Sequence, residues 1–405
     1  MPSHQDLSPL LDHPWSVALR TAAPGRSVHL VGGAIRDSWL GARQLADLDV
    51  TVDRQATELA RRLLDLVPAR LVVLGRKEHA ALRLVPHDAA LGDLDIWDRQ
   101  GGDLHADLER RDFTIHAVAV DVHSGQVIDP FRGLDDLEGR VLRETTPRTL
   151  FEDPQRTVRL VRLIAQLLDF SIDAVTRSRA IAAAPLLSQV AAERVAAELA
   201  RWTQQPRFLA GAGLLADLPP FAAVGRSLEG LERLAQLLSD RNDSPGEVRD
   251  TTIWSVIERQ APGEFIGWQD CGWVSSEVAR AVHRHRETGP IPHLVPDRRE
   301  WIFAHRAGWR SAALAALAEL DSAEAQVTLG ALERLAEDES LFAVRGLVSG
   351  EDLLRLGVPA GPALGGLLVD LRRREVRGEL GDREQALRLA RDHWRRITSA
   401  SSGAD

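Results

Sequence analysis

The stretch VHLVGGAIRDSWLG at residues 28–41 decides how the first part of this chain folds. Its apolar start is typical of a β-strand, and Gly32-Gly33 then leads into a pattern typical of a helix. Bare backbone N–H groups at such a turn, together with the positive end of the helix dipole, can bind an anion such as a triphosphate. Two glycines between a strand and a helix are more often only a tight turn, so both interpretations stay open at this point.

The first 150 residues alternate strand-like and helix-like patterns around this stretch. From Pro154 onward strand patterns almost vanish, and Ala, Leu, Arg and Glu at helical spacing dominate. We therefore predict an α+β head with a small mixed sheet and helices, followed by an all-α neck, body and tail. The predicted strands are 28–31, 47–52, 69–74, 79–85, 92–97 and 116–122, with helices at about 33–40 and 54–66.

The composition is that of a globular protein and restricts the function. A length of 405 residues predicts several domains, and 44% hydrophobic with 27% charged residues argues against a disordered chain. No apolar run reaches the roughly 18 residues of a membrane-spanning helix, and no signal-peptide pattern is seen, so we expect a cytoplasmic protein. The single Cys271 excludes an intrachain disulfide. A net charge of −9 argues against coating nucleic acid by bulk charge, while a local basic groove stays open.

Acidic side chains alternate with apolar ones on two predicted strands. In DLDVTV at 47–52, the period of two places Asp47 and Asp49 on one face. Two such carboxylates repel each other, and a hard divalent cation is their natural neutraliser. Asp93 and Asp95 repeat the alternation, so a third carboxylate on a neighbouring strand would complete a two-metal site. Either pair taken alone is more typical of a solvated strand face.

The segment ERRDFTIHA at 109–117 places two arginines beside Asp112. Such a group could hold phosphate and ribose hydroxyls together, or form only a surface ion pair. His116 taken alone is more typical of a hydrogen-bonded structural histidine than of a catalyst, because nothing near it in the sequence completes a triad.

In FEDPQR at 151–156, Asp153 is typical of a helix N-cap. Arg156, Arg159 and Arg162 follow at intervals of three, so they form one slowly drifting stripe on the expected helix. This stripe of guanidinium groups could pair with base edges and phosphates.

Together these motifs resemble one family, the class II tRNA nucleotidyltransferases and bacterial poly(A) polymerases of the polymerase-beta-like superfamily. The matching segments keep the family's order over 28–199 and are LVGGAIRD, DLD, DLERRDFTIHA, IDPFRGLDDLEGRVLR, FEDPQRTVRLVR and AAERVAAEL. A weaker resemblance covers 349–368, and none is seen between about 215 and 340. The resemblance implies a nucleotidyltransferase head at 1–147, a neck with a nucleobase-reading helix at 148–215, a helical body at 216–340 and a tRNA-binding tail at 341–405 whose last residues are frayed.

The resemblance also implies site roles. Asp47 and Asp49 are expected to bind Mg²⁺, with Asp95 as the best candidate for a third catalytic acid. Asp153 and Arg156 are expected to read the nucleobase in place of a template strand. The other expected nucleotide-binding residues are Gly32, Gly33 and Arg36 at the triphosphate, Arg111 and Asp112 at the phosphates and ribose, and Arg159 and Arg162 as supports for base reading.

The implied activity is transfer of C from CTP to the acceptor end of tRNA, and in full CCA-adding members also of A from ATP. The resemblance implies two-metal catalysis with release of pyrophosphate. No protein partner or membrane is implied. A bacterial poly(A) polymerase is the enzymatic alternative, and an RNA-binding protein without turnover is the alternative of another class.

Two departures from the family pattern bear on this activity. The motif around 116 usually carries asparagine where this chain has His116, so an imidazole replaces a contact that an asparagine amide normally makes near the ribose or phosphate. Only residues 96–109 separate Asp95 from Arg110, where full CCA-adding members carry a longer flexible loop. The short loop resembles members that add only the two cytidines, so CC addition is slightly favoured.

Overall fold

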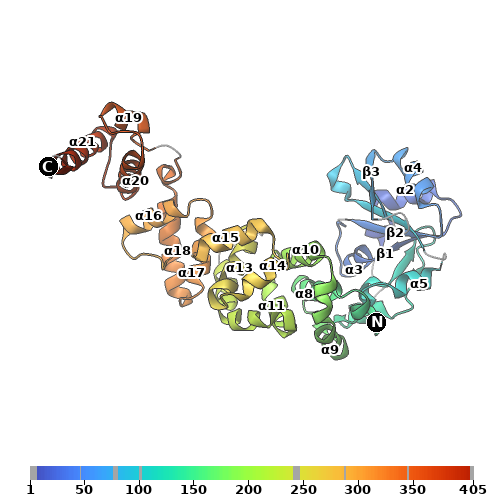
Figure 1. Cartoon of the computed structure of the whole chain (residues 1–405). Coiled ribbons are helices and arrows are strands. Elements are labelled where there is room, and N and C mark those ends of the chain that lie inside the picture. The colour runs from blue at the N-terminus through green and yellow to red at the C-terminus, as the bar shows by residue number, and fades with distance from the viewer. Residues whose placement is uncertain are drawn as a thin grey trace. The chain divides into compact units, whose positions relative to one another are not determined.

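The structure, a computed structural model, describes residues 7–401 except 46, 76–80, 100–102, 240–246, 287–288 and 344–345. It divides into two units, one formed by 1–202 with 214–222 and the other by 203–213 with 223–405. All strands of the described residues lie in the first unit, and helices make up the second (Figure 1). The predicted fold class, a mixed-sheet head followed by helices, is confirmed. The finer division into neck, body and tail stays a prediction.

A seven-stranded sheet in the order β3-β4-β5-β2-β1-β6-β7 forms the centre of the first unit. Strands β2 and β5 run parallel, whereas their other neighbours are antiparallel, so the sheet is mixed as predicted. The strands are β1 (Val28–Val31), β2 (Leu48–Val52), β3 (Ala69–Leu74), β4 (Ala81–Pro86), β5 (Leu94–Asp98), β6 (Ala119–Asp121) and β7 (Val127–Ile128).

Most predicted strands coincide with observed ones, and the main error lies at 116–122. Residues Thr114–His116 form a 3-10 turn, and the strand begins only at Ala119. The apolar alternation there reflects burial in a turn rather than a strand, since the N–H of Ala117 bonds back to the carbonyl of Thr114. The predicted start of β4 at 79–80 lies outside the described residues.

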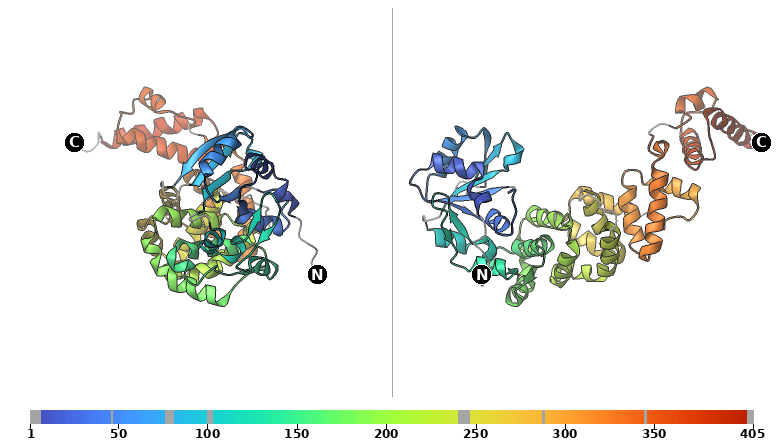
Figure 2. Two further views of the ribbon diagram at one scale, coloured as in Figure 1. Left: turned by 90° about the vertical axis from the view of Figure 1, so that its right-hand side faces the viewer. Right: turned by 180° about the vertical axis from the view of Figure 1, so that it is seen from behind.

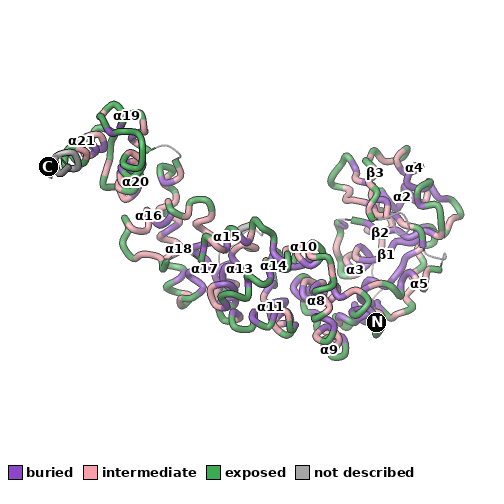
Figure 3. The backbone as a smooth tube through the Cα atoms, in the orientation of Figure 1, coloured by how far each residue is buried: buried purple, intermediate pink, exposed green. Residues whose placement is uncertain are grey.

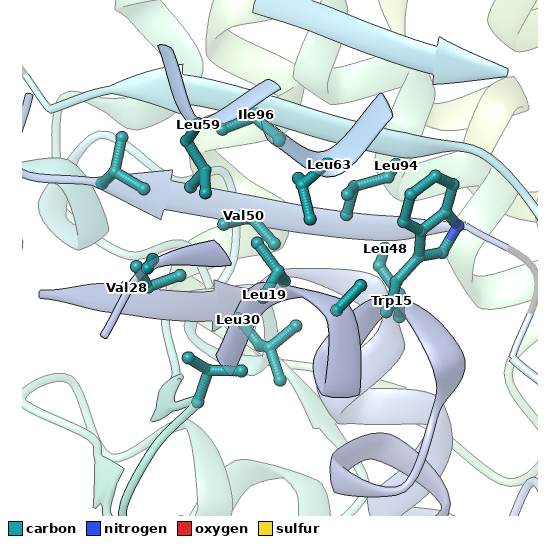
Figure 4. Close-up of a cluster of buried hydrophobic side chains, with 14 of the residues drawn as sticks. Trp15, Leu19, Val28, Leu30, Leu48, Val50, Leu59, Leu63, Leu94 and Ile96 are labelled. Carbon is teal, nitrogen blue, oxygen red and sulfur yellow. The ribbon is translucent and has the colours of Figure 1, made fainter. Parts of the chain in front are cut away.

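The alternation of side chains gives the sheet one apolar face, shown in Figure 4. Leu48, Val50, Leu94 and Ile96 point into a core closed by α2 (Pro14–Ala22) and α4 (Ala56–Leu64). Burying each such side chain stabilises the fold by roughly 1.5–3 kcal/mol. The register of β2 on β5 is therefore strongly fixed, and Asp49 is forced onto the opposite face.

Helices surround the sheet and follow it. Those up to Thr203 are α1 (Ser8–Leu11), α3 (Gly33–Trp39), α5 (Leu104–Glu109), α6 (Gly133–Glu138), α7 (Thr149–Glu152), α8 (Gln155–Gln166), α9 (Ala174–Ala183) and α10 (Ala192–Thr203), besides α2 and α4. A short parallel pair, β8 (Val141–Leu142) with β9 (Ser171–Ile172), was not expected from the sequence. Two-residue strands carry no periodic pattern, so nothing in the sequence indicated them.

The remaining chain is helical, coloured green to red in Figures 1 and 2. No helix of the described ranges is long and apolar enough to cross a membrane. Helix α21 extends into the terminus expected to be frayed, and 402–405 lie outside the described residues. These helices are α11 (Phe208–Asp217), α12 (Leu228–Ser239), α13 (Glu247–Gln260), α14 (Glu264–Asp270), α15 (Ser276–Arg286), α16 (Val295–Ala304), α17 (Trp309–Leu317), α18 (Ser322–Ala336), α19 (Gly350–Arg355), α20 (Pro362–Val376) and α21 (Arg383–Ser401).

Figure 3 shows which residues are buried, and the second unit has buried residues of its own. Trp254 on α13 is almost fully buried in the second unit. The last three helices, α19 to α21, pack around a cluster of their own that includes Leu353, Leu367 and Leu371. The helical spacing predicted in general terms for this part of the chain is thus accompanied by real buried faces.

Gly133 at the start of α6 fixes how that helix meets the turn at Thr114. A Cβ at this position would lie 2.1 Å from the carbonyl oxygen of Thr114. We expect Gly133→Ala to lower the free energy of unfolding of the first unit by about 3 kcal/mol, because backbone atoms must move apart. Gly365→Ala, at an exposed position of helix α20 where an added Cβ would meet nothing within 4 Å, should instead raise stability by about 0.5–1 kcal/mol. Urea unfolding followed by circular dichroism measures both; equal effects would contradict this packing.

Candidate active site

The turn between β1 and α3 approaches the acidic strand closely. Gly32 has φ +81°, a left-handed value that favours glycine. A Cβ on Gly32 would lie only 2.7 Å from Oδ2 of Asp49, so glycine is also needed for this approach. The predicted strand–turn–helix therefore exists, and it places the turn against the carboxylate of β2.

Asp49 and Asp95 lie side by side on the face of the sheet opposite the apolar core. They are partners in the parallel register of β2 and β5. Burial raises the pKa of Asp49, and the nearby charges of Asp95 and Asp47 raise it further, whereas Arg111 works against the shift. This like-charge crowding was predicted from the alternating pattern.

The structure does not assemble the expected three-acid metal site. Arg83 of β4 donates from Nε and Nη2 to the two oxygens of Asp95, at 2.8 and 2.7 Å. Asp47 lies just before β2, and its Oδ1 accepts the backbone N–H of Asp93 at 2.9 Å. Among the described residues, no group of three or more Asp, Glu, His or Cys side chains is arranged to hold a metal ion. In this arrangement Asp95 is paired with a guanidinium, and its role as a third acid stays a prediction.

Two carboxylates nonetheless suit a hard cation. Mg²⁺ commonly binds one or two carboxylates and takes its remaining ligands from water and substrate phosphates. Asp49 is crowded by like charge, and Asp47 uses only one oxygen in the contact with Asp93. The donor set of Asp47 and Asp49 therefore fits Mg²⁺ chemically.

Arg111 is held by two residues that the sequence reasoning missed. Its guanidinium lies 5.0 Å from the centre of the Trp97 ring, a cation–π contact. Asp107 of α5 accepts from Trp97 Nε1 at 3.1 Å and lies 3.5 Å from Nη2 of Arg111. The available signal was the period of β5, since Trp97 is two residues after Asp95 and shares its face.

Asp112 is a buried junction of hydrogen bonds. It accepts from Arg159 Nη1 at 2.9 Å, from His116 Nδ1 at 2.8 Å and from the backbone N–H of Phe113 at 2.8 Å. Burial alone raises the pKa of this carboxyl, but His116 and Arg159 outweigh burial and hold the pKa well below its usual range. The structure thus gives Asp112 protein partners, where the sequence suggested ribose or phosphate.

The arginine stripe on α8 exists as predicted. Arg156, Arg159 and Arg162 are half-buried, and most residues between them are buried. Glu198 of α10 accepts from Arg159 Nε at 3.0 Å and from Arg162 Nε at 2.7 Å. Glu198 is fully buried and was missed, although it lies within the segment AAEL that matched the family pattern.

Base reading was expected from Asp153 and Arg156, which flank the start of α8. Asp153 accepts from Arg194 Nη2 at 2.8 Å and lies 3.8 Å from Nε of Arg156. Arg156 also donates to the carbonyl of Arg110 at 2.7 Å. A carboxylate acceptor and a guanidinium donor are therefore held next to each other.

These residues enclose a cavity of about 380 Å³ within the first unit. Seven arginines and three acids line it, so the cavity is basic although the chain as a whole has a net charge of −9. Such a lining suits a polyanion. Asp47, Asp95 and Asp153 are predicted site residues that do not line this cavity. The lining consists of Gly32, Gly33, Arg36, Asp49, Arg110, Arg111, Asp112, His116, Arg156, Arg159, Arg162, Gln166, Glu198 and Arg201.

Comparisons with known proteins match both the head and the whole chain. A family model described as "Poly A polymerase head domain" matches residues 28–143. The CC-adding tRNA nucleotidyltransferase of Geobacter sulfurreducens is 30% identical over 400 residues, which cover 90% of this chain and 91% of that protein. A protein of the same name from Synechocystis sp. is 38% identical over 179 residues, 44% of this chain and 42% of that protein.

The fold has counterparts among solved structures. The CCA-adding enzyme of Bacillus stearothermophilus in complex with CTP matches with a TM-score of 0.70 at 22% identity. The match covers 97% of this chain and 99% of that chain. At this level of identity the likeness concerns the fold.

Glu198 generates a prediction about stability. Glu198→Gln leaves Arg162 without its buried counter-charge and Arg159 with Asp112 alone, so we expect the free energy of unfolding to fall by about 3 kcal/mol. The facing arginines outweigh burial and lower the pKa of Glu198 below its usual 4.5. The stabilisation by ionised Glu198 is thus present above its usual pKa and is lost as the pH falls through its lower pKa in the folded protein. Below that pH the free energies of unfolding of wild type and variant should converge.

Urea unfolding at neutral pH and at about pH 3 measures this difference. The matched control is Glu193→Gln, an exposed glutamate on the same helix, which should change stability by less than about 1 kcal/mol. A Glu198→Gln protein as stable as wild type at neutral pH would contradict the assignment.

Proposed function

Because this chain belongs to the class II tRNA nucleotidyltransferase and poly(A) polymerase family, we propose that it transfers cytidine from CTP to the 3′ end of tRNA and releases pyrophosphate. The observation that carries the proposal is the arginine-lined cavity, which brings the Gly32 turn, Asp49 and the stripe of α8 into one site. The Geobacter sulfurreducens relative supports tRNA as the acceptor, because its likeness extends over 90% of this chain.

The product is proposed to be CC, without the final A. Strand β5 ends at Asp98 and α5 begins at Leu104, so the connection is short. Asp103 caps α5 by accepting the N–H of His105 at 2.9 Å, and Trp97 is tied to Asp107 of the same helix. Because α5 is anchored in this way, we expect the site to keep its specificity for cytidine. The longer loop of full CCA-adding members has room to rearrange.

The chain's own residues would hold the nucleotide in two places, at its triphosphate and at its base. The triphosphate lies against Gly32 and Gly33, with Arg36 and Arg111 donating to its oxygens. The Watson–Crick edge of cytosine offers one amino donor and two acceptors, which the Asp153 acceptor and the Arg156 donors complement. Base recognition then needs no template strand, because the protein supplies the pairing edge.

The proposed cofactor is Mg²⁺ on Asp47 and Asp49. When bound, the ion would supply Lewis-acid activation of the tRNA 3′-hydroxyl and neutralise charge on the pyrophosphate. Asp95 is proposed as a supporting acid that holds Arg83 at the edge of the site.

Replacing the two metal-binding acids should separate activity from stability. We expect Asp47→Asn with Asp49→Asn to reduce cytidine incorporation at least about a thousandfold, because the cation loses its protein ligands. The melting temperature should stay the same or rise, since two mutually repelling charges are removed. Incorporation of labelled CTP into tRNA lacking its 3′ end, together with thermal unfolding, measures both quantities.

Asp65→Asn is the control for this experiment, because that exposed residue at the end of α4 lies outside the cavity. It should leave incorporation unchanged. Substantial incorporation by the double variant would refute the metal assignment.

Sequencing the products tests the proposed specificity. Purified protein is incubated with tRNA lacking its 3′ end and with CTP alone, ATP alone or both. We expect two cytidines with CTP, no extension with ATP, and no terminal A when both are present. A terminal A would contradict the CC product, long A tracts on generic RNA would indicate a poly(A) polymerase, and tight tRNA binding without pyrophosphate release would indicate a binding protein.

A further inference from the structure

His116 connects two arginines of the cavity through one buried carboxylate. Its Nε2 lies 2.7 Å from Nη1 of Arg36, and its Nδ1 lies 2.8 Å from Oδ1 of Asp112. The other oxygen of Asp112 accepts from Arg159 at 2.9 Å. The sequence offered His116 only as a structural histidine that departs from the family pattern, and these contacts give it a more specific place.

The partners of His116 fix its tautomer. A guanidinium can only donate hydrogen bonds, so Nε2 must accept from Arg36 and the ring proton must lie on Nδ1, where it is donated to Asp112. Burial lowers the pKa of His116, and Arg36 and Arg159 lower it further against the opposing effect of Asp112. The ring is therefore neutral near pH 7.

Arg36 is gripped from two sides. Its Nε and Nη2 donate to the carboxylate of Asp37 on α3, at 2.8 and 2.9 Å, while Nη1 donates to His116. A Cβ on Gly33 would lie 3.5 Å from Nη2 of Arg36, so the guanidinium lies over the turn of the cavity. A long arginine side chain held in this way loses little freedom when an anion binds.

We propose that His116 is a positioning residue that holds Arg36 toward the phosphates of the incoming nucleotide and couples this arginine, through Asp112, to Arg159 on α8. The inference rests on the proposed function, since it assumes that the cavity takes a nucleoside triphosphate. One buried carboxylate then orients both a phosphate-binding arginine and an arginine of the base-reading helix. An asparagine is too short to do the same, because its amide ends near the position of Nδ1 and reaches Asp112 but not Arg36.

Binding measurements on His116 variants test the coupling. Calorimetry compares inorganic triphosphate, CTP and CMP on the full-length protein with Mg²⁺. We expect His116→Leu to weaken inorganic triphosphate and CTP at least about tenfold, because a charged hydrogen bond that orders Arg36 is lost, and CMP by less than about threefold. His116→Gln should restore most of the lost affinity, since its amide oxygen reaches toward the place of Nε2.

A second buried histidine provides the matched control. His29 of β1 is buried on the same sheet and does not line the cavity. His29→Leu should lower the melting temperature without changing the ratio of CTP to CMP affinity. If His116→Leu weakens CTP and CMP equally, or weakens neither, the proposal is overturned.

Nitrogen-15 NMR of the wild-type imidazoles gives a readout that needs no variant. At about pH 7.5 the signal of His116 should be that of the neutral Nδ1–H tautomer, and an Nε2–H tautomer or an imidazolium would overturn the proposal. The two hypotheses fail differently. Wild-type protein that binds inorganic triphosphate but transfers no cytidine contradicts the proposed function, whereas transfer with unaltered triphosphate affinity in His116→Leu contradicts the positioning role.

Discussion

The parallel pairing of β2 with β5 is the constraint on which the site depends. Leu48 and Val50 must face the apolar core, so the period of the strand places Asp49 on the other face, directly beside Asp95. A slip of one residue would bury the carboxylates and expose the leucine and valine. Hydrophobic burial in the head thus holds two like charges together, and the Gly32 turn and Arg111 then gather around them.

Charge compensation is the second constraint on the cavity. Asp112 and Glu198 are buried acids whose desolvation is offset by the arginines that they hold. Each of these acids orients a guanidinium of the cavity, so the positive charges that line the cavity are held in fixed positions. The chain as a whole is acidic, yet its proposed anion site is locally basic.

Local patterns predicted most of the head well. The turn after Val31, the strands β1 to β5 and the stripe of α8 all follow from periodicity, because the same buried faces that impose the period also stabilise the elements. The strand predicted at 116–122 begins only at Ala119, because apolar alternation also occurs in the buried 3-10 turn that precedes it. The sequence did not predict the pairing of β8 with β9, because its register is set by distant parts of the chain and not by the residues of the two strands.

The sequence by itself determined the mixed-sheet head, the helical remainder, the resemblance to one family and the identity of most cavity residues. Only the tertiary structure decided the partners: Arg83 on Asp95, Glu198 on two arginines, Trp97 beneath Arg111, and His116 between Arg36 and Asp112. These contacts join residues on different elements, and a periodic pattern carries no information about which distant side chain will neutralise a charge. Spacing therefore predicted where charged groups point, while packing determined what each of them binds.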